Sequence, residues 1–372
     1  MSSLDNGRVI PDAPTTSHPL LATVRGVVCD LDGVVYRGKA AVPHAVDALE
    51  RVRAAGRGVV YATNNAARTP QEVAKQLAGL GLTLTPADVV TSSQAGAAAL
   101  SELVPAGSEV LAVGGEGVAE ALRGVGLAPL TSAAVAARAG RDHGQRAATA
   151  PGVVGVLQGY GPEVGWADLA EAAYAVQSGA VWVATNVDAT LPTARGIAPG
   201  NGTLVDAVSR ATGKQPVVVG KPHTPLYDLS ARVLGVQPQE TLAIGDRLDT
   251  DIAGARAAGM PSLLVLTGVH GVREVAGADA PQRPRYIAMD LRALDRPYVD
   301  PVGDGEVWTC GQARVVVDDG GAVTVQRAGS PDERLRCVVA ACWRLRADGR
   351  QLPHRNDEAW DRIAEQVEAE HG

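Results

Sequence analysis

Residues 24–34 read VRGVVCDLDGV, a short apolar run that ends in two aspartates and a glycine. The β-branched residues before Asp30 predict a buried strand, and Gly33 allows the chain to turn directly after it. Asp30 and Asp32 would then leave the strand close together, where their ionised carboxylates repel one another. A divalent metal ion would offset this repulsion, although an Asp-x-Asp-Gly sequence alone is also compatible with an ordinary turn.

The composition is that of an ordinary globular protein with 372 residues, of which 46% are hydrophobic and 20% charged. This length allows two or three domains. The net charge of −7 comes with scattered Lys and Arg, so we expect neither a nucleic-acid nor a membrane partner. The N-terminus lacks the basic start and apolar core of a signal peptide, and no apolar run approaches the ~20 residues of a membrane span. Four widely spaced cysteines without metal-binding spacing predict reduced thiols and a cytoplasmic location.

Strands and helices alternate along the chain, which predicts the α/β class with a Rossmann-like parallel sheet covered by helices on both faces. Residues 24–94 and 214–298 are expected to form this core. Between them, residues 95–213 have their own alternation of strands and helices and are predicted to be an inserted α/β cap domain. The predicted core strands are Gly26–Cys29, Gly58–Ala62, Val217–Val219, Thr241–Ile244 and Ser262–Leu266.

Both ends of the chain differ from this pattern. Residues 1–23 are rich in turn formers and lack apolar periodicity, which predicts a flexible N-terminal extension. Residues 299–372 predict a small appended α+β domain. It should contain a hairpin across residues 318–321 and helices at 335–347 and 357–370.

Polar residues follow four of the predicted core strands, and the ends of parallel strands gather at one edge of a sheet. Each cluster alone has an ordinary explanation, such as a helix cap, a solvated lysine or a charged turn. Together they supply the groups for metal-assisted phosphoryl transfer. The clusters are Asp30 with Asp32, then Thr63-Asn64-Asn65, then Lys221, and finally Asp246 with Asp249 and Asp251.

These residues resemble the four motifs of the haloacid dehalogenase (HAD) superfamily, and the resemblance covers roughly residues 24–295. The matching sequences are DLDG at 30–33, TN at 63–64, GKP at 220–222 and GDRLDTDI at 245–252. The aspartate at position 32 resembles the residue that the phosphatase and mutase branch of this superfamily carries there. The long insertion lies between Asn65 and Lys221, as in the subclass with a C2 α/β cap that includes NagD-like, p-nitrophenyl, pyridoxal-phosphate and phosphoglycolate phosphatases.

The resemblance implies a role for each motif residue. Asp30 would be the nucleophile that forms an aspartyl-phosphate, and Asp32 would be the general acid and base. Mg²⁺ would be held by Asp30, the backbone carbonyl of Asp32 and Asp246. Lys221 would offset the charge of Asp30 and the phosphate, and Asp251 would orient Lys221 or metal-bound waters.

The same resemblance assigns Thr63, Asn64 and Asn65 to the phosphoryl oxygens. Asn186 and Asp188, in the cap string ATNVD, would line the substrate face of the cap, with a simple turn cap as an equal alternative for Asp188. His270 follows the last strand of this set and is expected in a solvated loop. A homodimer formed through the cap would be typical of the subclass.

The appended unit and the composition are similar to the glycerol-3-phosphate phosphatases of mycobacteria and their relatives. This resemblance implies that glycerol 3-phosphate is hydrolysed during glycerophospholipid turnover. Other small phosphomonoesters, namely 2-phosphoglycolate, pyridoxal phosphate or nucleotides, are the alternative substrates, and a phosphotransferase or mutase is the alternative class. The appended unit resembles an acetyltransferase-like fragment, but residues 303–372 show no acyl-CoA pyrophosphate loop, so we expect a packing or regulatory role.

Overall fold

The computed structural model describes residues 19–139, 152–193 and 195–350, together with residues 352, 361, 364 and 365. Its central element is a six-stranded sheet of order β15-β14-β13-β1-β4-β5, in which all neighbours are parallel. The predicted Rossmann-like core is therefore confirmed. Its strands are β1 (Gly26–Cys29), β4 (Gly58–Thr63), β5 (Val89–Thr91), β13 (Thr241–Gly245), β14 (Ser262–Val265) and β15 (Tyr286–Ala288).

Helices cover both faces of this sheet, because successive strand residues point to opposite sides and both sides are apolar. Val27 and Val59 pack with α1 (Ala45–Ala54) and α2 (Pro70–Gly79) in one cluster. Val28 and Val60 pack in another cluster with α3 (Ser92–Leu103), α8 (Pro225–Leu234) and α9 (Ala253–Ala257). Burial on both faces leaves the strand ends as the place for polar chemistry.

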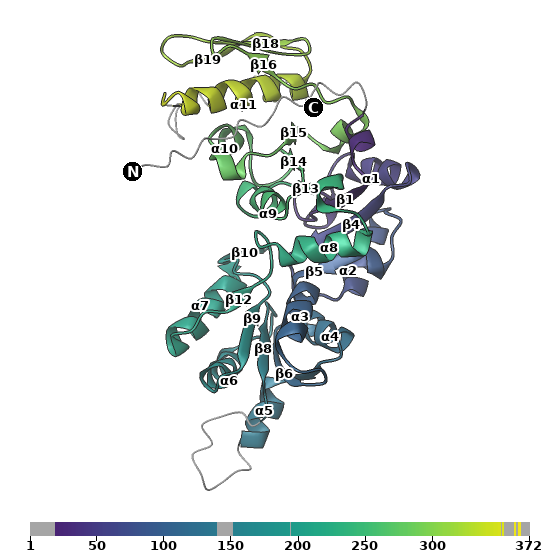
Figure 1. The fold of residues 1–372 in the computed structure, drawn as a ribbon, viewed down its shortest axis with the longest axis vertical. Coiled ribbons are helices and arrows are strands. Elements are labelled where there is room, and N and C mark those ends of the chain that lie inside the picture. Colours follow the sequence, from purple (N-terminus) through teal and green to yellow (C-terminus); the bar gives the residue numbers. More distant parts are fainter. Residues whose placement is uncertain are drawn as a thin grey trace, which may run out of the picture.

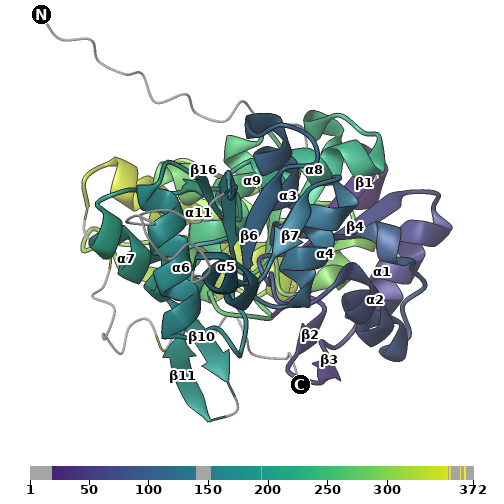
Figure 2. The ribbon, with the colours of Figure 1, turned by 90° about the horizontal axis from the view of Figure 1, so that it is seen from below.

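The cap is a second parallel sheet of order β12-β9-β8-β6-β7, which lies below the core in Figure 1. Its helices are α4 (Glu116–Gly124), α5 (Ser132–Ala139), α6 (Trp166–Gln177) and α7 (Asn201–Thr212). A hairpin of β10 (Thr190–Thr193) and β11 (Gly196–Pro199) projects from it in Figure 2. The other strands are β6 (Glu109–Val113), β7 (Ala128–Leu130), β8 (Gly155–Gln158), β9 (Val181–Ala184) and β12 (Val217–Val218).

The expectation that Val217–Val219 is a core strand is wrong. Val217 and Val218 pair in parallel with Val183 and Ala184 of the cap sheet. A short apolar run looks the same in either sheet, so the sequence pattern could not assign it. Lys221 consequently follows a cap strand and lies where the chain crosses from the cap back to the core.

The predicted N-terminal extension is wrong for its last residues. Leu20–Thr23 form a 3₁₀ turn, and Leu20 and Leu21 are buried in the core cluster beside α1. The backbone N–H of Leu20 donates to the carbonyl of Arg296 at 3.1 Å. Two leucines are too few to show periodicity, which is why this anchor was missed. Residues 1–18 lie outside the described part of the chain.

The C-terminal unit is a four-stranded antiparallel sheet covered by one helix, α11 (Pro331–Ala347). The predicted hairpin is confirmed between β18 (Ala313–Val317) and β19 (Val323–Arg327), and β16 (Val302–Gly303) and β17 (Val307–Cys310) complete the sheet. The predicted helix at 335–347 is confirmed and begins earlier, behind a capping box of Ser330 and Glu333. The helix predicted at 357–370 falls almost wholly outside the described residues.

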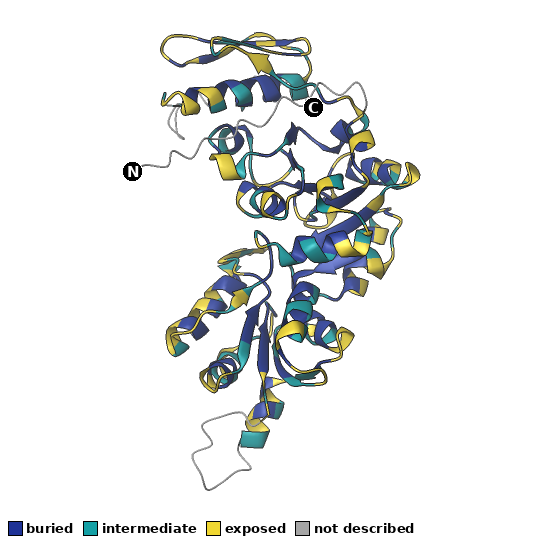
Figure 3. Ribbon diagram, in the orientation of Figure 1, coloured by how far each residue is buried: buried dark blue, intermediate teal, exposed yellow. Residues whose placement is uncertain are grey.

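This unit shares one apolar cluster with the core, between α11 and α10 (Val272–Ala276). Figure 3 shows α11 largely buried between its own sheet and the core. The four cysteines, Cys29, Cys310, Cys337 and Cys342, are buried and free. Among the described helices, none has the length and apolar character needed to cross a membrane.

Candidate active site

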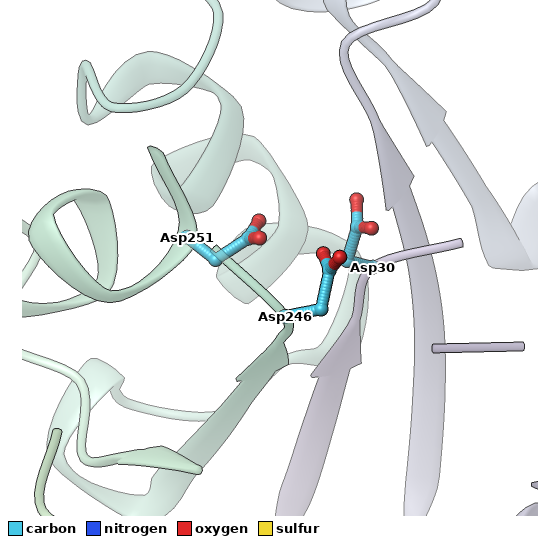
Figure 4. Close-up of side chains that lie close together, drawn as sticks. All are labelled: Asp30, Asp246 and Asp251. Carbon is cyan, nitrogen blue, oxygen red and sulfur yellow. The ribbon is translucent and has the colours of Figure 1, made fainter. Parts of the chain in front are cut away.

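Three neighbouring core strands deliver the central acids and hydroxyl to one edge of the sheet. Asp30 directly follows β1, Thr63 ends β4, and Asp246 directly follows β13, with β1 between the other two. Asp251 joins them from the turn after β13, and Figure 4 shows its carboxylate beside those of Asp30 and Asp246. Each of these three acids offers an oxygen within 4.8 Å of the others.

Lys221 lies among these acids and is almost fully buried. Its ammonium group donates to Oδ1 of Asp30 and, at 2.9 Å, to Oδ1 of Asp251. Burial alone would lower the pKa of Lys221, but the carboxylates of Asp251 and Asp30 raise it well above its usual range. The lysine therefore stays charged and holds Asp30 in place.

Asp251 is engaged by the protein through both of its oxygens. Oδ1 accepts from Lys221, and Oδ2 accepts from the backbone N–H of Arg247 at 3.1 Å. The hydroxyl of Tyr227 donates to the carbonyl of Asp251 at 2.9 Å and fixes its backbone. Asp251 is therefore fixed in place and binds the ammonium group of Lys221.

The carboxylate of Asp246 lies against two glycines, Gly33 and Gly268. Its Oδ2 accepts from the backbone N–H of Val269 at 2.7 Å. A Cβ atom added to Gly268 would lie 1.9 Å from this oxygen, and one added to Gly33 would lie 2.4 Å from it. Burial and the charge of Asp251 raise the pKa of Asp246 to about 6. A cation beside Asp246 would offset both effects.

Asp32 lies apart from this carboxylate cluster, at a turn that Gly33 makes with φ of 83°. Its Oδ2 is 3.5 Å from the hydroxyl of Tyr36, in the small flap of β2 (Tyr36–Arg37) and β3 (Ala40–Ala41). Although Asp32 is exposed, the groups packed around it partly remove its carboxyl from water and raise its pKa, and the charges of Arg68 and Lys221 oppose that rise. The Asp32 carboxyl thus stands near the cluster without belonging to it.

The loop after β4 connects the core to the cap. The side chain of Asn64 accepts from the N–H of Lys221 at 2.8 Å and donates to its carbonyl at 3.1 Å. Thr63 accepts from the N–H of Asn65 at 3.1 Å, and Asn65 accepts from the N–H of Ala67 at 3.0 Å. The Asn64 side chain therefore holds the backbone on which Lys221 sits.

The structure brings the two cap residues to this same loop. Asn186 donates to the carbonyl of Asn64 at 2.8 Å, and Asp188 accepts from the Asn64 side chain at 3.3 Å. Burial raises the pKa of Asp188, whereas the hydrogen bond from Asn64 opposes this rise. Asp188 thus faces the core loop as well as lying in a turn of the cap.

Sequence reasoning missed several residues around the cluster. Val269 and Gly268 both contact the carboxylate of Asp246 closely. His270 is not simply a solvated loop residue, because its Nδ1 accepts from the N–H of Leu248 at 2.8 Å. Arg68 was also not among the predicted site residues. Only the glycine at 268, three residues after the end of β14, offered a sequence signal.

A parallel α/β core with paired acids, a buried lysine and amides at its strand ends defines a hydrolase of the phosphoryl-transfer class. The sequence matches the family described as haloacid dehalogenase-like hydrolase over residues 27–128, and a second family described as HAD-hydrolase-like over residues 218–294. The chain belongs to the haloacid dehalogenase-like phosphatases.

Individual relatives cover most of the chain. The D-glycerol 3-phosphate phosphatase of Mycobacterium tuberculosis is 40% identical over 345 residues, which span 88% of this chain and 89% of the relative. The glycerol-3-phosphate phosphatase of Gallus gallus is 36% identical over 78% of this chain and 93% of its own length.

Solved structures agree with this assignment. The crystal structure of glycerol phosphate phosphatase from Mycobacterium tuberculosis in complex with magnesium has a TM-score of 0.76 and 38% identity, covering 94% of this chain and 98% of its own. The p-nitrophenyl phosphatase from Archaeoglobus fulgidus has a TM-score of 0.63 and 25% identity over 73% of this chain and 97% of its own.

Proposed function

We propose that this phosphatase hydrolyses glycerol 3-phosphate with the help of Mg²⁺, through an aspartyl-phosphate on Asp30. The observation that carries the proposal is the buried arrangement in which Lys221 binds both Asp30 and Asp251 while Asp246 lies beside them. The lysine offsets the repulsion between the two acids that it binds, and it keeps a positive charge where an anionic phosphate would meet Asp30.

The donor set fits Mg²⁺, which prefers oxygen ligands and keeps several waters. Asp30, the backbone carbonyl of Asp32 and Asp246 would hold the ion, since Asp251 has both oxygens engaged by Lys221 and Arg247. When bound, the ion would offset the negative charge of the phosphate and of the acids. The magnesium complex of the mycobacterial relative supports this choice of metal.

The residues then have separate tasks. Asp30 attacks phosphorus in line with the leaving group, while Lys221 and Thr63, with the backbone amide of Asn64, bind the phosphoryl oxygens. Asp32 donates its proton to the leaving alkoxide. It then takes a proton from the water that hydrolyses the aspartyl-phosphate. Asn65 supports this phosphate-binding loop through its bond to Ala67.

The substrate is assigned from the relatives and the cap. Two relatives are named for glycerol 3-phosphate, and the alignment with one of them spans 88% of this chain. Asn186 and Asp188 would contact the glycerol part, because both face the core loop of Asn64. Their carboxylate and amide groups suit hydroxyl groups of a small polyol.

A substrate panel with Mg²⁺ tests the proposal. Free phosphate and kcat/KM are measured for glycerol 3-phosphate, 2-phosphoglycolate, pyridoxal phosphate, nucleotides and p-nitrophenyl phosphate. We expect the highest kcat/KM for glycerol 3-phosphate. A higher value for another monoester would replace the substrate, and transfer of the phosphoryl group to a second hydroxyl without free phosphate would indicate a phosphotransferase or mutase.

The proposal extends to the organisation of the protein. We assign residues 24–94 and 219–298 to the catalytic core, 95–218 to the cap and 299–372 to a packing unit, with the cap limit moved past β12. A cytoplasmic location and a role in glycerophospholipid turnover fit the free cysteines and the substrate. We also propose that the protein forms a homodimer through the cap, which light scattering of the purified protein would test.

A further inference from the structure

Tyr36 and Arg68 form a contact chain to Asp32 that none of the four sequence motifs contains. The Arg68 guanidinium donates from Nη2 to the Tyr36 hydroxyl at 3.3 Å. The Tyr36 hydroxyl in turn lies 3.5 Å from Oδ2 of Asp32. The two residues come from different segments, the flap after β1 and the loop after β4, and the fold brings them together beside the proposed acid.

The chemistry of the groups fixes the direction of both hydrogen bonds. A guanidinium group has donors and no acceptor, so the Tyr36 oxygen must accept from Arg68. The single hydroxyl proton of Tyr36 is then directed to Oδ2 of Asp32. An oxygen that accepts this bond is a poor place for the acid proton of a carboxyl group, which leaves Oδ1 to carry it.

Both partners are held firmly. Tyr36 is 3% exposed, and its backbone carbonyl accepts from the N–H of Gly33 at 2.9 Å. Arg68 is anchored on its other side by the side chain of Gln76 in α2. Burial and the charge of Asp32 raise the pKa of Tyr36 to about 12, so its proton stays on the hydroxyl at neutral pH.

We propose that Arg68 and Tyr36 are positioning residues that direct the acid proton of Asp32 to Oδ1, the oxygen that serves the leaving group. The inference rests on the proposed role of Asp32. As the bond between Asp30 and phosphorus forms, the bond from phosphorus to the leaving oxygen breaks. The proton then passes from Oδ1 to that oxygen, and Asp32 becomes the carboxylate that later accepts a proton from water.

The leaving group distinguishes this role from a structural one. Glycerol leaves as a strongly basic alkoxide and needs the proton, whereas p-nitrophenolate is stable without it. The value of kcat/KM covers the steps up to formation of the aspartyl-phosphate. Loss of proton positioning should therefore lower kcat/KM for glycerol 3-phosphate and spare that for p-nitrophenyl phosphate.

The experiment compares Tyr36→Phe, Arg68→Met and Arg68→Lys with the unchanged full-length protein and Mg²⁺. We expect Tyr36→Phe and Arg68→Met to lower kcat/KM for glycerol 3-phosphate about tenfold or more beyond their effect on kcat/KM for p-nitrophenyl phosphate. General acid catalysis typically accelerates a reaction by ~10²–10⁴-fold, and misplacing the proton should lose part of this acceleration. Arg68→Lys keeps a cationic donor and should recover most of the loss. If Tyr36→Phe does not fold, the two Arg68 variants decide.

Two matched controls remove the same groups elsewhere. Tyr61→Phe deletes another buried hydroxyl, one without a hydrogen-bond partner among the described residues, and Arg37→Met deletes an exposed arginine of the same flap. Both should keep the ratio of the two kcat/KM values. Equal losses on both substrates in the Tyr36 and Arg68 variants would overturn the inference while leaving the phosphatase intact. Failure of the unchanged protein to hydrolyse either substrate would instead refute the proposed function.

Discussion

Replacement of Gly268 by alanine should weaken metal binding without replacing any proposed ligand. The added Cβ would lie 1.9 Å from Oδ2 of Asp246 and 2.4 Å from its Cγ. Ordinary contact begins near 3.4 Å, so the carboxylate must move by about 1.5 Å. Gly33 approaches the same oxygen, since a Cβ atom built on Gly33 would lie 2.4 Å from it.

A shift of that size exceeds the tolerance of a metal site, in which ligand distances hold to about ±0.2 Å. Loss of supporting contacts around metal ligands typically costs ~10–100-fold in affinity, and a displaced ligand costs at least as much. We therefore expect the Mg²⁺ concentration for half-maximal activity to rise about a hundredfold, which corresponds to about 2.7 kcal/mol. The backbone of Gly268 has no positive φ, so alanine adds no conformational strain there.

The assay is a Mg²⁺ titration of phosphate release, with circular dichroism as a check on folding. Gly271→Ala is the matched control, because its Cβ would meet its nearest atom, in Glu274, at 3.5 Å. This variant lies in the same loop and should keep the original Mg²⁺ dependence. An unchanged Mg²⁺ dependence in Gly268→Ala would show that Asp246 does not bind the metal.

Three further predictions concern the nucleophile, the acids and the appended unit. Asp30→Asn should lower phosphate release by more than about a thousandfold, whereas Asp249→Asn, which alters only an exposed ion pair with Arg247, should retain most activity; equal effects would contradict the assignment. Because the pKa of Asp246 rises from 3.8 to about 6 on folding, its contribution to stability is lost as pH rises through about 6. Thermal unfolding should therefore show a larger Mg²⁺-induced rise in Tm at pH 7 than at pH 5, and an equal rise would contradict this. Trp343→Ala removes a bond of 2.7 Å to the carbonyl of Val275 and should cost about 2–3 kcal/mol in urea unfolding, against about 0–1 kcal/mol for exposed Arg344→Ala; similar small values would refute the packing role.

The parallel core could be predicted because its strands are short β-branched runs bounded by turn residues. The grouping of the residues at the strand ends into one site could be predicted, because parallel strands end at one edge of the sheet. Asp30, Thr63 and Asp246 lie at this edge. The sequence could not predict which of the two sheets a short apolar strand joins. Val217 and Val218 form the same apolar pattern in a cap strand as in a core strand, and only the pairing distinguishes the two.

The supporting residues were harder to predict, because their importance depends on contacts between distant segments. Tyr36 meets Arg68 across two loops, and Val269 reaches Asp246 from the loop after the next strand. Neither contact leaves a periodic or spaced signal in the sequence. Leu20 was missed for a related reason, since its burial depends on a partner near Arg296.

The most direct test of the account is to trap a phosphoryl group on Asp30. Asp32→Asn should form the intermediate from p-nitrophenyl phosphate, whose leaving group needs no proton, and then hydrolyse it slowly for want of a base. Rapid mixing with Mg²⁺ should give a burst of p-nitrophenol equal to the enzyme concentration. Mass spectrometry after acid quenching should find one phosphoryl group on the peptide that contains Asp30. A burst-free time course with no phosphorylated peptide, in a variant that still turns over, would contradict covalent catalysis by Asp30.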